Sequence, residues 1–316
     1  MTKIVISMAT LLVLACPLAC TKGGSDANES NAEPYVKPNI SSDDLLPEGV
    51  AGSPFVPPSG SLEEFTADCN TQKLAIVGGQ RVTAAHSIAL STVKIMFTFK
   101  GSCTGTLLSP TVILTAAHCM ANSQDVSLLS LGLGPEGKAT DITIAEIIVH
   151  PDFKGLDGLK RDDQESLNDV ALIRLSKPVP SPYRGVPIAN PQAFQAGDKA
   201  VTAGFGALAE KDLQVRPLSA VATKLLKLMP ELNEIQLETG TGVGPCYGDS
   251  GGPTYIMDPT STDSCLQLVG VTTGPSRGKN YICDEGSGTL MDVTRFQEWI
   301  QSSISAFYPF APADSK

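Results

Sequence analysis

Short apolar or alternating segments recur along the chain from residue 92 onward, and most of them have the length of a β-strand. They are rich in β-branched residues, and glycine, proline, asparagine or aspartate bounds them. This pattern predicts strands at residues 92–99, 111–116, 142–149, 170–175, 200–206 and 266–273. Strands separated by such turn residues are typical of a β-barrel or a β-sandwich.

The C-terminal segment is the part of the chain whose pattern has a convincing α-helical period. Its apolar residues recur at steps of three and four. They are Val293, Phe296, Ile300, Ile304 and Phe307, with Trp299 beside them. Many strands followed by one terminal helix place the chain in the all-β class.

Composition and charge narrow the classes of partner. The 316 residues carry a formal net charge of −10 and contain no run of basic residues. Nucleic acids and anionic lipid surfaces both attract basic proteins, so we expect neither to bind this chain through charge. The 42% of hydrophobic and 18% of charged residues are ordinary for a soluble globular protein, and the 29 glycines and 23 prolines suit a fold with many turns.

The first twenty residues have the pattern of a secretory signal peptide. Lys3 precedes an apolar run over residues 4–15, which is too short to span a bilayer. Small residues and two cysteines follow, Cys16 in "VLAC" and Cys20 in "PLAC", and each resembles the lipidation site of a bacterial lipoprotein.

The number of cysteines favours Cys20 as the lipidated residue. Cleavage before Cys20 leaves six further cysteines, an even number, whereas cleavage before Cys16 leaves Cys20 without a partner. Pro17 is unusual in such a site, so cleavage without lipidation is the alternative. These features predict an exported bacterial protein, either an outer-membrane lipoprotein or a periplasmic or secreted form.

Residues 21–75 are predicted to form a disordered tether or pro-segment. The stretch from 21 to 68 is rich in serine, asparagine, glycine, proline and acidic residues and has few aromatic ones. Such a composition buries too little apolar surface to offset the chain entropy lost on folding. We expect folded structure to begin near Cys69.

The segment "GPCYGDSGGP", residues 244–253, carries the candidate chemistry. Six of its ten residues are glycine or proline, and Asp249 and Ser250 lie among them. A serine held in such a turn can direct its hydroxyl outward while nearby N–H groups face the same space, as a nucleophile beside an oxyanion hole requires. For this segment alone, a glycine-rich surface turn is the alternative.

A serine nucleophile needs an adjacent base and a third group that orients the base. The chain has three histidines, His86, His118 and His150, and His118 directly follows a predicted strand and precedes a cysteine. Asp169 stands at the start of another predicted strand, where a buried orienting acid is expected. Taken singly, a partly buried structural histidine is the alternative for His118, and Asp169 fits a strand-start residue better than a catalytic one.

The order His118, Asp169, Ser250 separates two families of serine hydrolase. In α/β-hydrolases the histidine comes after the serine, but no histidine follows Ser250 here. The order and several motifs resemble the trypsin/chymotrypsin-like serine proteases, from Ile76 to about Ile304. The matching segments are "IVGG" (76–79), "CTGTLLSPTVILTAAHC" (103–119), "EIIVHPDF" (146–153), "NDVALIRL" (168–175), "CYGDSGGP" (246–253) and "FQEWI" (296–300).

This resemblance implies a fold and a division of roles. The fold is a protease domain over residues 76–316, made of two six-stranded antiparallel β-barrels and a C-terminal helix, with the site between the barrels. Ser250 would attack the scissile carbonyl, His118 would transfer its proton, and Asp169 would hold the imidazole in the required tautomer.

Two further features of the family concern charge stabilisation and activation. The backbone N–H groups of Gly248 and Ser250 would form the oxyanion hole. Asp249 would pair with the new α-amino group of Ile76 once the zymogen is cleaved before that residue. Ala75 precedes Ile76 where many relatives have arginine or lysine, so a protease that prefers small residues is a candidate activator.

The specificity pocket departs from the family's pattern. The pocket residues that the resemblance implies are Gly244, Thr273, Gly274 and Gly288. Gly244 stands at the base, where trypsin-like members carry an aspartate, and Thr-Gly-Pro replaces the usual Ser-Trp-Gly of one wall. We therefore expect cleavage after uncharged residues, unless Asp284 or Glu285 reaches the pocket and restores basic specificity.

The resemblance also implies two disulfide bonds. Cys103 with Cys119 would close the histidine loop, and Cys246 with Cys283 would brace the pocket. Cys69 and Cys265 are left over, and a bridge between them would tether the pro-segment to the catalytic unit after activation.

Together these features predict an exported serine endopeptidase, made as a zymogen that another protease activates. It would act as a monomer on protein or peptide substrates, without a cofactor or metal, and would reach a membrane only through a lipid anchor. Two alternatives remain: a binding lipoprotein on an inactive protease fold, and an esterase that uses the same three residues.

Overall fold

The computed structural model describes residues 80–84, 86–98, 101–121, 126–155, 167–207, 216–238, 244–257, 266–274, 283 and 287–308. All of them belong to the unit Phe55–Lys316. The predictions for the signal peptide, the tether, Cys20, Cys69, Ile76 and Cys265 lie outside the described residues and stay predictions. Within those ranges, no helix is long and apolar enough to cross a membrane.

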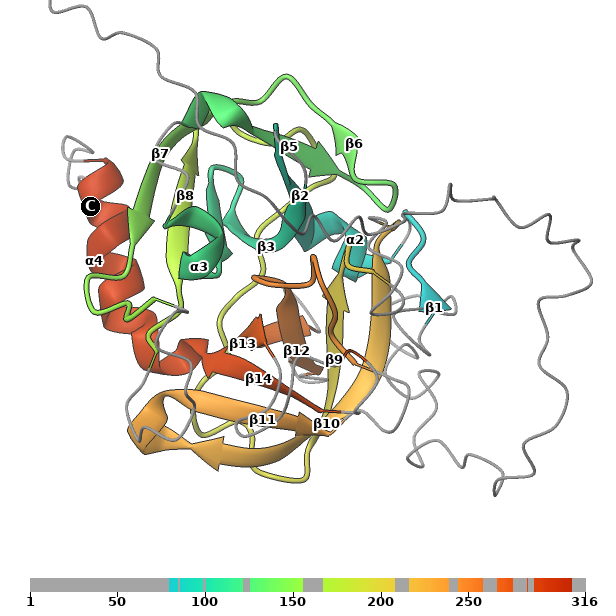
Figure 1. Ribbon diagram of the computed structural model, residues 1–316, viewed down its shortest axis with the longest axis vertical. Helices are drawn as coiled ribbons and strands as arrows, with labels where there is room; N and C mark the ends of the chain where they lie inside the picture. Colours follow the sequence, from blue (N-terminus) through green and yellow to red (C-terminus); the bar gives the residue numbers. More distant parts are fainter. Residues whose placement is uncertain are drawn as a thin grey trace, which may run out of the picture. The chain divides into compact units, whose positions relative to one another are not determined.

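The N-terminal half of the described chain forms one seven-stranded antiparallel sheet (Figure 1). Its strands are β2 (Thr92–Phe97), β3 (Ser102–Ser109), β4 (Val112–Thr115), β5 (Leu129–Leu133), β6 (Lys138–Ala139), β7 (Ile144–Val149) and β8 (Ala171–Leu175). They lie in the order β6-β5-β2-β3-β4-β8-β7. Within the described residues no ladder joins the two ends of this sheet, although β5 and β7 lie in contact.

The C-terminal half forms a second sheet, which closes on itself. Its strands are β1 (Gln80–Arg81), β9 (Lys199–Gly204), β10 (Ser219–Met229), β11 (Glu234–Glu238), β12 (Pro253–Met257), β13 (Leu266–Gly274) and β14 (Ser287–Asp292). β9 pairs with both β12 and β10, so the six strands from β9 to β14 form a closed barrel. β1 adds to this barrel along β10.

One hydrophobic cluster contains residues of both sheets, and the second sheet has a further cluster of its own. β4 is buried at all four positions and β13 at eight of nine, so both strands lie inside the fold. Tyr255 of β12 is fully buried, and its hydroxyl lies 2.9 Å from Ser91 Oγ and 3.2 Å from Thr92 Oγ1. This tyrosine therefore links the closed barrel of the second sheet to the start of β2 in the first sheet.

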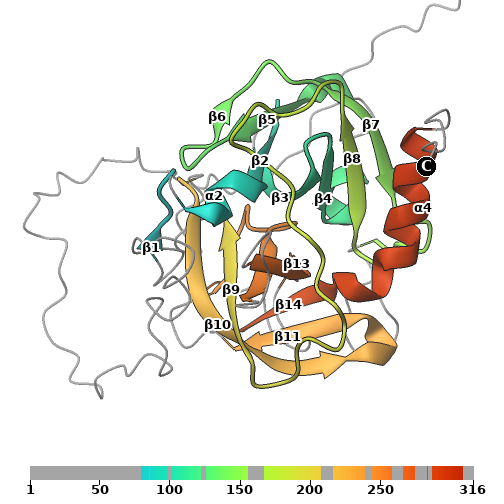
Figure 2. The same cartoon turned by 180° about the vertical axis from the view of Figure 1, so that it is seen from behind.

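The helices of the described residues are short. They are α2 (Ser87–Ser91), α3 (Ala117–Met120) and α4 (Gln297–Phe307), with 3₁₀ turns η1 (Val126–Leu128), η2 (Pro230–Leu232) and η3 (Val293–Phe296). α4 lies along β7 and β8 in both views (Figures 1 and 2). The Arg174 guanidinium of β8 lies 5.8 Å from the ring centre of Phe307, so the helix end packs on the first sheet.

The all-β class and the chymotrypsin-like architecture predicted from the sequence are confirmed. Of the two six-stranded barrels expected, the second is closed, and the first is a seven-stranded half-barrel within the described residues. All six expected strands are present, as β2, β4, β7, β8, β9 and β13, with ends that differ by at most two residues. The terminal helix begins at Gln297 rather than Val293, because residues 293–296 form η3, capped by the Asp292 carboxylate. The sequence pattern missed the other eight described strands, among them β3 and β14, whose serines and glycines are typical of turns.

His86 caps α2 with a buried imidazole. Its side chain accepts the Ile88 N–H through Nδ1 at 3.2 Å, so the ring is neutral with its proton on Nε2. Nε2 is buried without a hydrogen-bond partner within the described residues. Burial lowers the pKa of His86 below its ordinary value of 6.5, because a charged imidazolium loses its hydration there.

This burial predicts that acid destabilises the fold through His86. Between its lowered pKa and 6.5 the unfolded chain binds a proton that the folded chain does not, so the free energy of unfolding falls as the pH falls through that window. His86→Asn keeps a capping oxygen but cannot titrate. Urea unfolding from pH 5 to 8 should give a shallower pH dependence for the variant, and identical slopes for the two proteins would contradict this role.

Candidate active site

Ser250 lies on a tight turn that leads into β12. Asp249 donates its N–H to the Cys246 carbonyl oxygen at 3.0 Å, and the Ser250 carbonyl oxygen accepts the N–H of Thr104 from β3 at 2.8 Å. Gly251 has a φ of +80°, and a side chain there would overlap the Thr104 carbonyl oxygen. Only glycine fits this position, both for its left-handed backbone and for the close approach of β3.

His118 and Asp169 are joined by two hydrogen bonds. His118 lies in α3, directly after β4, and Asp169 precedes β8. The Asp169 carboxylate accepts the backbone N–H of His118 at 2.8 Å, and its second oxygen lies 2.7 Å from His118 Nδ1. Asp169 is fully buried, while the histidine side chain is 14% exposed. A carboxylate at Nδ1 places the proton on that nitrogen and leaves Nε2 able to accept one.

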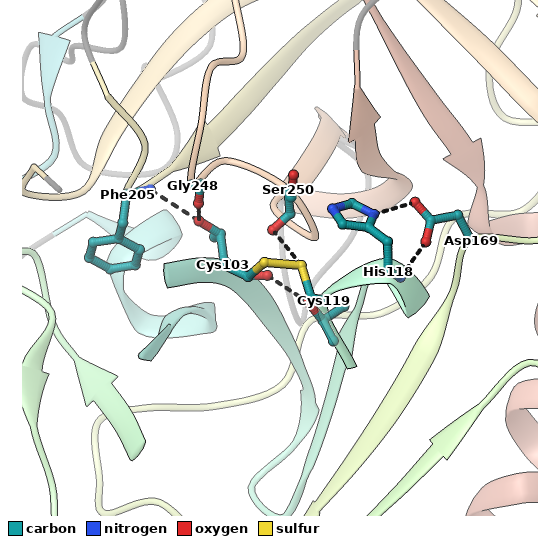
Figure 3. The surroundings of a disulfide bond; sticks show 9 residues. Cys103, His118, Cys119, Asp169, Phe205, Gly248 and Ser250 are labelled. Atoms are coloured by element: carbon teal, nitrogen blue, oxygen red, sulfur yellow. Dashed lines mark hydrogen bonds and ion pairs between the residues drawn. A yellow bond between two sulfur atoms is a disulfide. The ribbon is translucent and has the colours of Figure 1, made fainter. Parts of the chain in front are cut away.

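Ser250 lies on the other side of the imidazole from Asp169. In Figure 3 the Nδ1 edge of the ring faces the carboxylate, and the opposite edge faces Ser250. Ser250 is 9% exposed. No hydrogen bond joins Ser250 to His118 among the described residues, and such bonds are commonly long before substrate binds. The structure thus brings the three predicted residues together in the expected order.

The Cys103–Cys119 disulfide holds the histidine segment against β3, as predicted. Cys119 follows His118 directly, and its Sγ lies 3.8 Å from the Ser250 carbonyl oxygen (Figure 3). Cys103, His118 and Cys119 offer potential ligand atoms within 4.8 Å of one another. Because both sulfurs are in the disulfide, they are not thiolates, and this cluster does not fit a metal ion.

Asp249 is buried with two hydrogen bonds from the backbone. One carboxylate oxygen accepts the Gly206 N–H and the other accepts the Cys246 N–H, each at 2.8 Å. Burial raises the pKa of Asp249 to about 7, although both N–H groups oppose this rise. No cationic side chain pairs with the carboxylate among the described residues. An ionised Asp249 would therefore have no cationic side chain beside it within the described residues.

The predicted pocket residues lie together and are all buried. Gly274 of β13 pairs with Thr289 of β14, which places Gly274 beside Gly288. A Cβ atom on Gly288 would lie 2.8 Å from Cγ of Pro245, so this wall is tightly packed. The Thr273 hydroxyl is buried without a hydrogen-bond partner in the described part of the chain.

The predicted Cys246–Cys283 disulfide is also present. It links the segment before Ser250 to the part of the chain that leads into β14. Asp284 and Glu285, which might supply charge to the pocket, lie outside the described residues.

Sequence reasoning missed a polar contact behind Asp169. Asn168 and Asn233 are the two described residues other than glycine with positive φ, at 47° and 54°, and Asn233 Nδ2 donates to Asn168 Oδ1 at 3.3 Å. Arg295 Nε donates to Asn233 Oδ1 at 3.0 Å. Asparagine tolerates this backbone region better than most residues, which explains why asparagine occupies both positions. The sequence offered no signal that connects residues 65 positions apart.

Comparison with known proteins agrees with this geometry. Residues 76–300 match the Trypsin family. The chain is 33% identical to Serine protease 56 of Mus musculus over 223 residues. These aligned residues cover 65% of this chain and 35% of that protein. It is 29% identical over 236 residues to Kallikrein 1-related peptidase b27 of Mus musculus, covering 67% of this chain and 84% of the relative. Ovochymase of Halocynthia roretzi is 26% identical over 254 residues, which span 71% of this chain but only 15% of Ovochymase.

The match to Serine protease 56 thus covers well under half of that relative's length, whereas the family match covers most of this chain. The predicted motifs, the two disulfides and the barrel architecture all fall within the matched residues. The chain therefore belongs to the trypsin family of serine proteases.

Proposed function

We propose that this protein is a serine endopeptidase that cleaves peptide bonds through Ser250, His118 and Asp169. One observation carries the proposal: the buried Asp169 carboxylate lies 2.7 Å from His118 Nδ1, and Ser250 faces the opposite edge of the same ring. Such an arrangement leaves Nε2 to remove the serine proton.

In this mechanism the Ser250 oxygen attacks the scissile carbonyl carbon while His118 Nε2 takes the hydroxyl proton. Asp169 stabilises the resulting imidazolium without itself taking the proton. The N–H groups of Gly248 and Ser250 donate to the oxyanion of the tetrahedral intermediate. His118 then gives its proton to the leaving amine, and water hydrolyses the acyl-enzyme by the reverse sequence.

A fluorophosphonate probe and a peptide library together test this function. The probe should label wild-type protein at Ser250 and fail to label Ser250→Ala, and the library should be cleaved. Labelling without peptide cleavage, combined with hydrolysis of simple esters, would replace the endopeptidase with the esterase. Absence of labelling in correctly matured protein would favour the inactive binding lipoprotein.

The neutral pocket predicts cleavage after uncharged residues. Gly244 and Gly288 supply no charge, and burying a cation without a partner is strongly unfavourable. Peptides that differ only at the residue before the cleaved bond should show kcat/KM at least about 100-fold higher for leucine or phenylalanine than for arginine or lysine. Preferred cleavage after arginine or lysine would instead indicate that Asp284 or Glu285 reaches the pocket.

Activation and location are further parts of the proposal. The family's "IVGG" motif supports cleavage between Ala75 and Ile76 as the step that produces the active enzyme. The N-terminal sequence supports export through a signal peptide, with Cys20 as the lipidated residue. N-terminal sequencing of the active enzyme and metabolic labelling with a fatty acid would test these two points separately.

A further inference from the structure

Every polar atom of Thr104 in β3 makes a hydrogen bond, and two of these bonds reach the turn that carries Ser250. Its side chain is fully buried. Its N–H donates to the Ser250 carbonyl oxygen at 2.8 Å, and its own carbonyl oxygen accepts the Thr115 hydroxyl at 2.8 Å. The hydroxyl makes two more hydrogen bonds, so this residue has no unpaired polar group.

The hydroxyl of Thr104 connects two backbone segments that the chain keeps far apart in sequence. It donates to the Gly248 carbonyl oxygen at 2.8 Å and accepts the Phe205 N–H at 3.1 Å (dashed lines from Gly248 and Phe205 in Figure 3). A threonine hydroxyl has one proton, so accepting from Phe205 obliges it to donate to Gly248. The direction of both bonds is therefore fixed.

Each segment that Thr104 holds carries a group of the candidate site. Gly248 would supply one N–H of the oxyanion hole, and its φ of +97° is a conformation that a glycine leaves easily. Phe205 precedes Gly206, whose N–H donates to the Asp249 carboxylate. A single side chain thus joins the turn at Gly248 to the backbone that contacts Asp249.

We propose that the Thr104 hydroxyl is a positioning group that fixes the Gly248 peptide for transition-state stabilisation. Thr104 holds the Gly248 carbonyl through its side chain and the Ser250 carbonyl through its backbone, so it fixes both ends of the three-residue turn. The Gly248 carbonyl lies on the peptide unit that ends at the Asp249 N–H, whereas the Gly248 N–H lies on the preceding unit, so the hydroxyl acts on that N–H through the φ and ψ angles of Gly248. Without the hydroxyl these angles are less restrained, and the Gly248 N–H can turn away from the developing oxyanion. This inference rests on the proposed function, because an oxyanion hole matters only if Ser250 acts as a nucleophile.

Two substitutions of Thr104 distinguish the effect of its hydroxyl from the effect of its side-chain size. Thr104→Val keeps the shape but removes the donor and acceptor, and Thr104→Ser keeps both. Thr104→Val is expected to lower kcat by about 10- to 100-fold with little change in KM, and Thr104→Ser to retain most of the activity. The rate of fluorophosphonate labelling at Ser250 should fall in parallel, since that reaction also builds negative charge on an oxygen.

Thr223→Val is the matched control. Thr223 of β10 is also buried, and its hydroxyl donates to a backbone carbonyl oxygen, that of Glu238, at 2.7 Å. Its loss should change stability without changing kcat. Thr104→Ala is measured as well, in case Thr104→Val does not fold, because the smaller side chain leaves room for water.

Hydrogen exchange supplies a readout that does not depend on activity. In full-length Thr104→Val or Thr104→Ala, the amide of Phe205 should exchange faster by about tenfold or more, because it has lost its acceptor. Unchanged exchange, or equal kcat in Thr104→Val and wild type, would overturn the positioning role. Wild-type protein that is not labelled at Ser250 would instead overturn the proposed function, and with it the positioning role in catalysis.

Discussion

Ser250→Ala and His118→Ala are each expected to lower kcat by about 10⁶-fold while leaving the fold intact. In the proposed mechanism the two side chains act as one unit with Asp169, so removing either one should remove nearly all of the covalent route. Residual rate would come from substrate binding and from the N–H donors of the turn. The same reasoning predicts that the double variant is no slower than either single variant.

Active-site titration and peptide turnover measure this effect, and urea unfolding checks that each variant is folded. Ser303→Ala is a suitable control, because Ser303 is a buried serine of α4 and lies outside the candidate site. It should retain full turnover. Substantial turnover by folded Ser250→Ala protein would remove Ser250 from the mechanism and, with it, the proposed endopeptidase.

The sequence singled out the candidate triad residues because chemistry restricts which residue types can serve. Only three histidines exist, and only His118 combines a preceding strand with a following cysteine. The strands were predicted where apolar residues dominate, as in β4 and β8. The sequence did not predict β3, since "SCTGTLLS" has the composition of a turn, although tertiary packing makes it a central strand.

The supporting contacts of the site were beyond sequence reasoning for a different reason. The Thr104 hydroxyl bonds to Gly248, 144 positions away, and Asn233 bonds to Asn168, 65 positions away. Threonine and asparagine are common residues, so neither type marks a special position. Only the folded backbone shows which of them lie behind the chemistry.

Asp249→Asn is expected to lower kcat by about 10²- to 10³-fold, the cost of misplacing an oxyanion-hole donor. In the proposed activation step the Asp249 carboxylate pairs with the α-amino group of Ile76. Burial explains why this pairing would be favourable. It raises the pKa of Asp249 to about 7, and a nearby cation would lower that pKa again by stabilising the ionised form. Asparagine carries no charge, so it cannot offset the desolvation cost of burying the new amino group.

The pH dependence of stability provides the companion measurement. In protein still joined at Ala75, the folded Asp249 carboxyl holds a proton between pH 3.8 and about 7 that the unfolded carboxyl has released. The free energy of unfolding of this form should therefore decrease as the pH rises through that window, and Asp249→Asn should remove this contribution. Asparagine offers one acceptor to the two N–H donors of Gly206 and Cys246, so the slopes against pH are compared rather than the absolute stabilities.

Cleavage before Ile76 should reverse this behaviour in the wild type alone. An ionised Asp249 paired with the amino group has a lowered pKa, so the cleaved protein should lose stability as the pH falls instead of as it rises. Pairing also raises the pKa of the α-amino group above its ordinary value of about 8, so activity and that added stability should be lost only as the pH rises through this raised value. Full activity in a form that retains Ala75, or in Asp249→Asn, would show that the turn at Ser250 assembles without the ion pair.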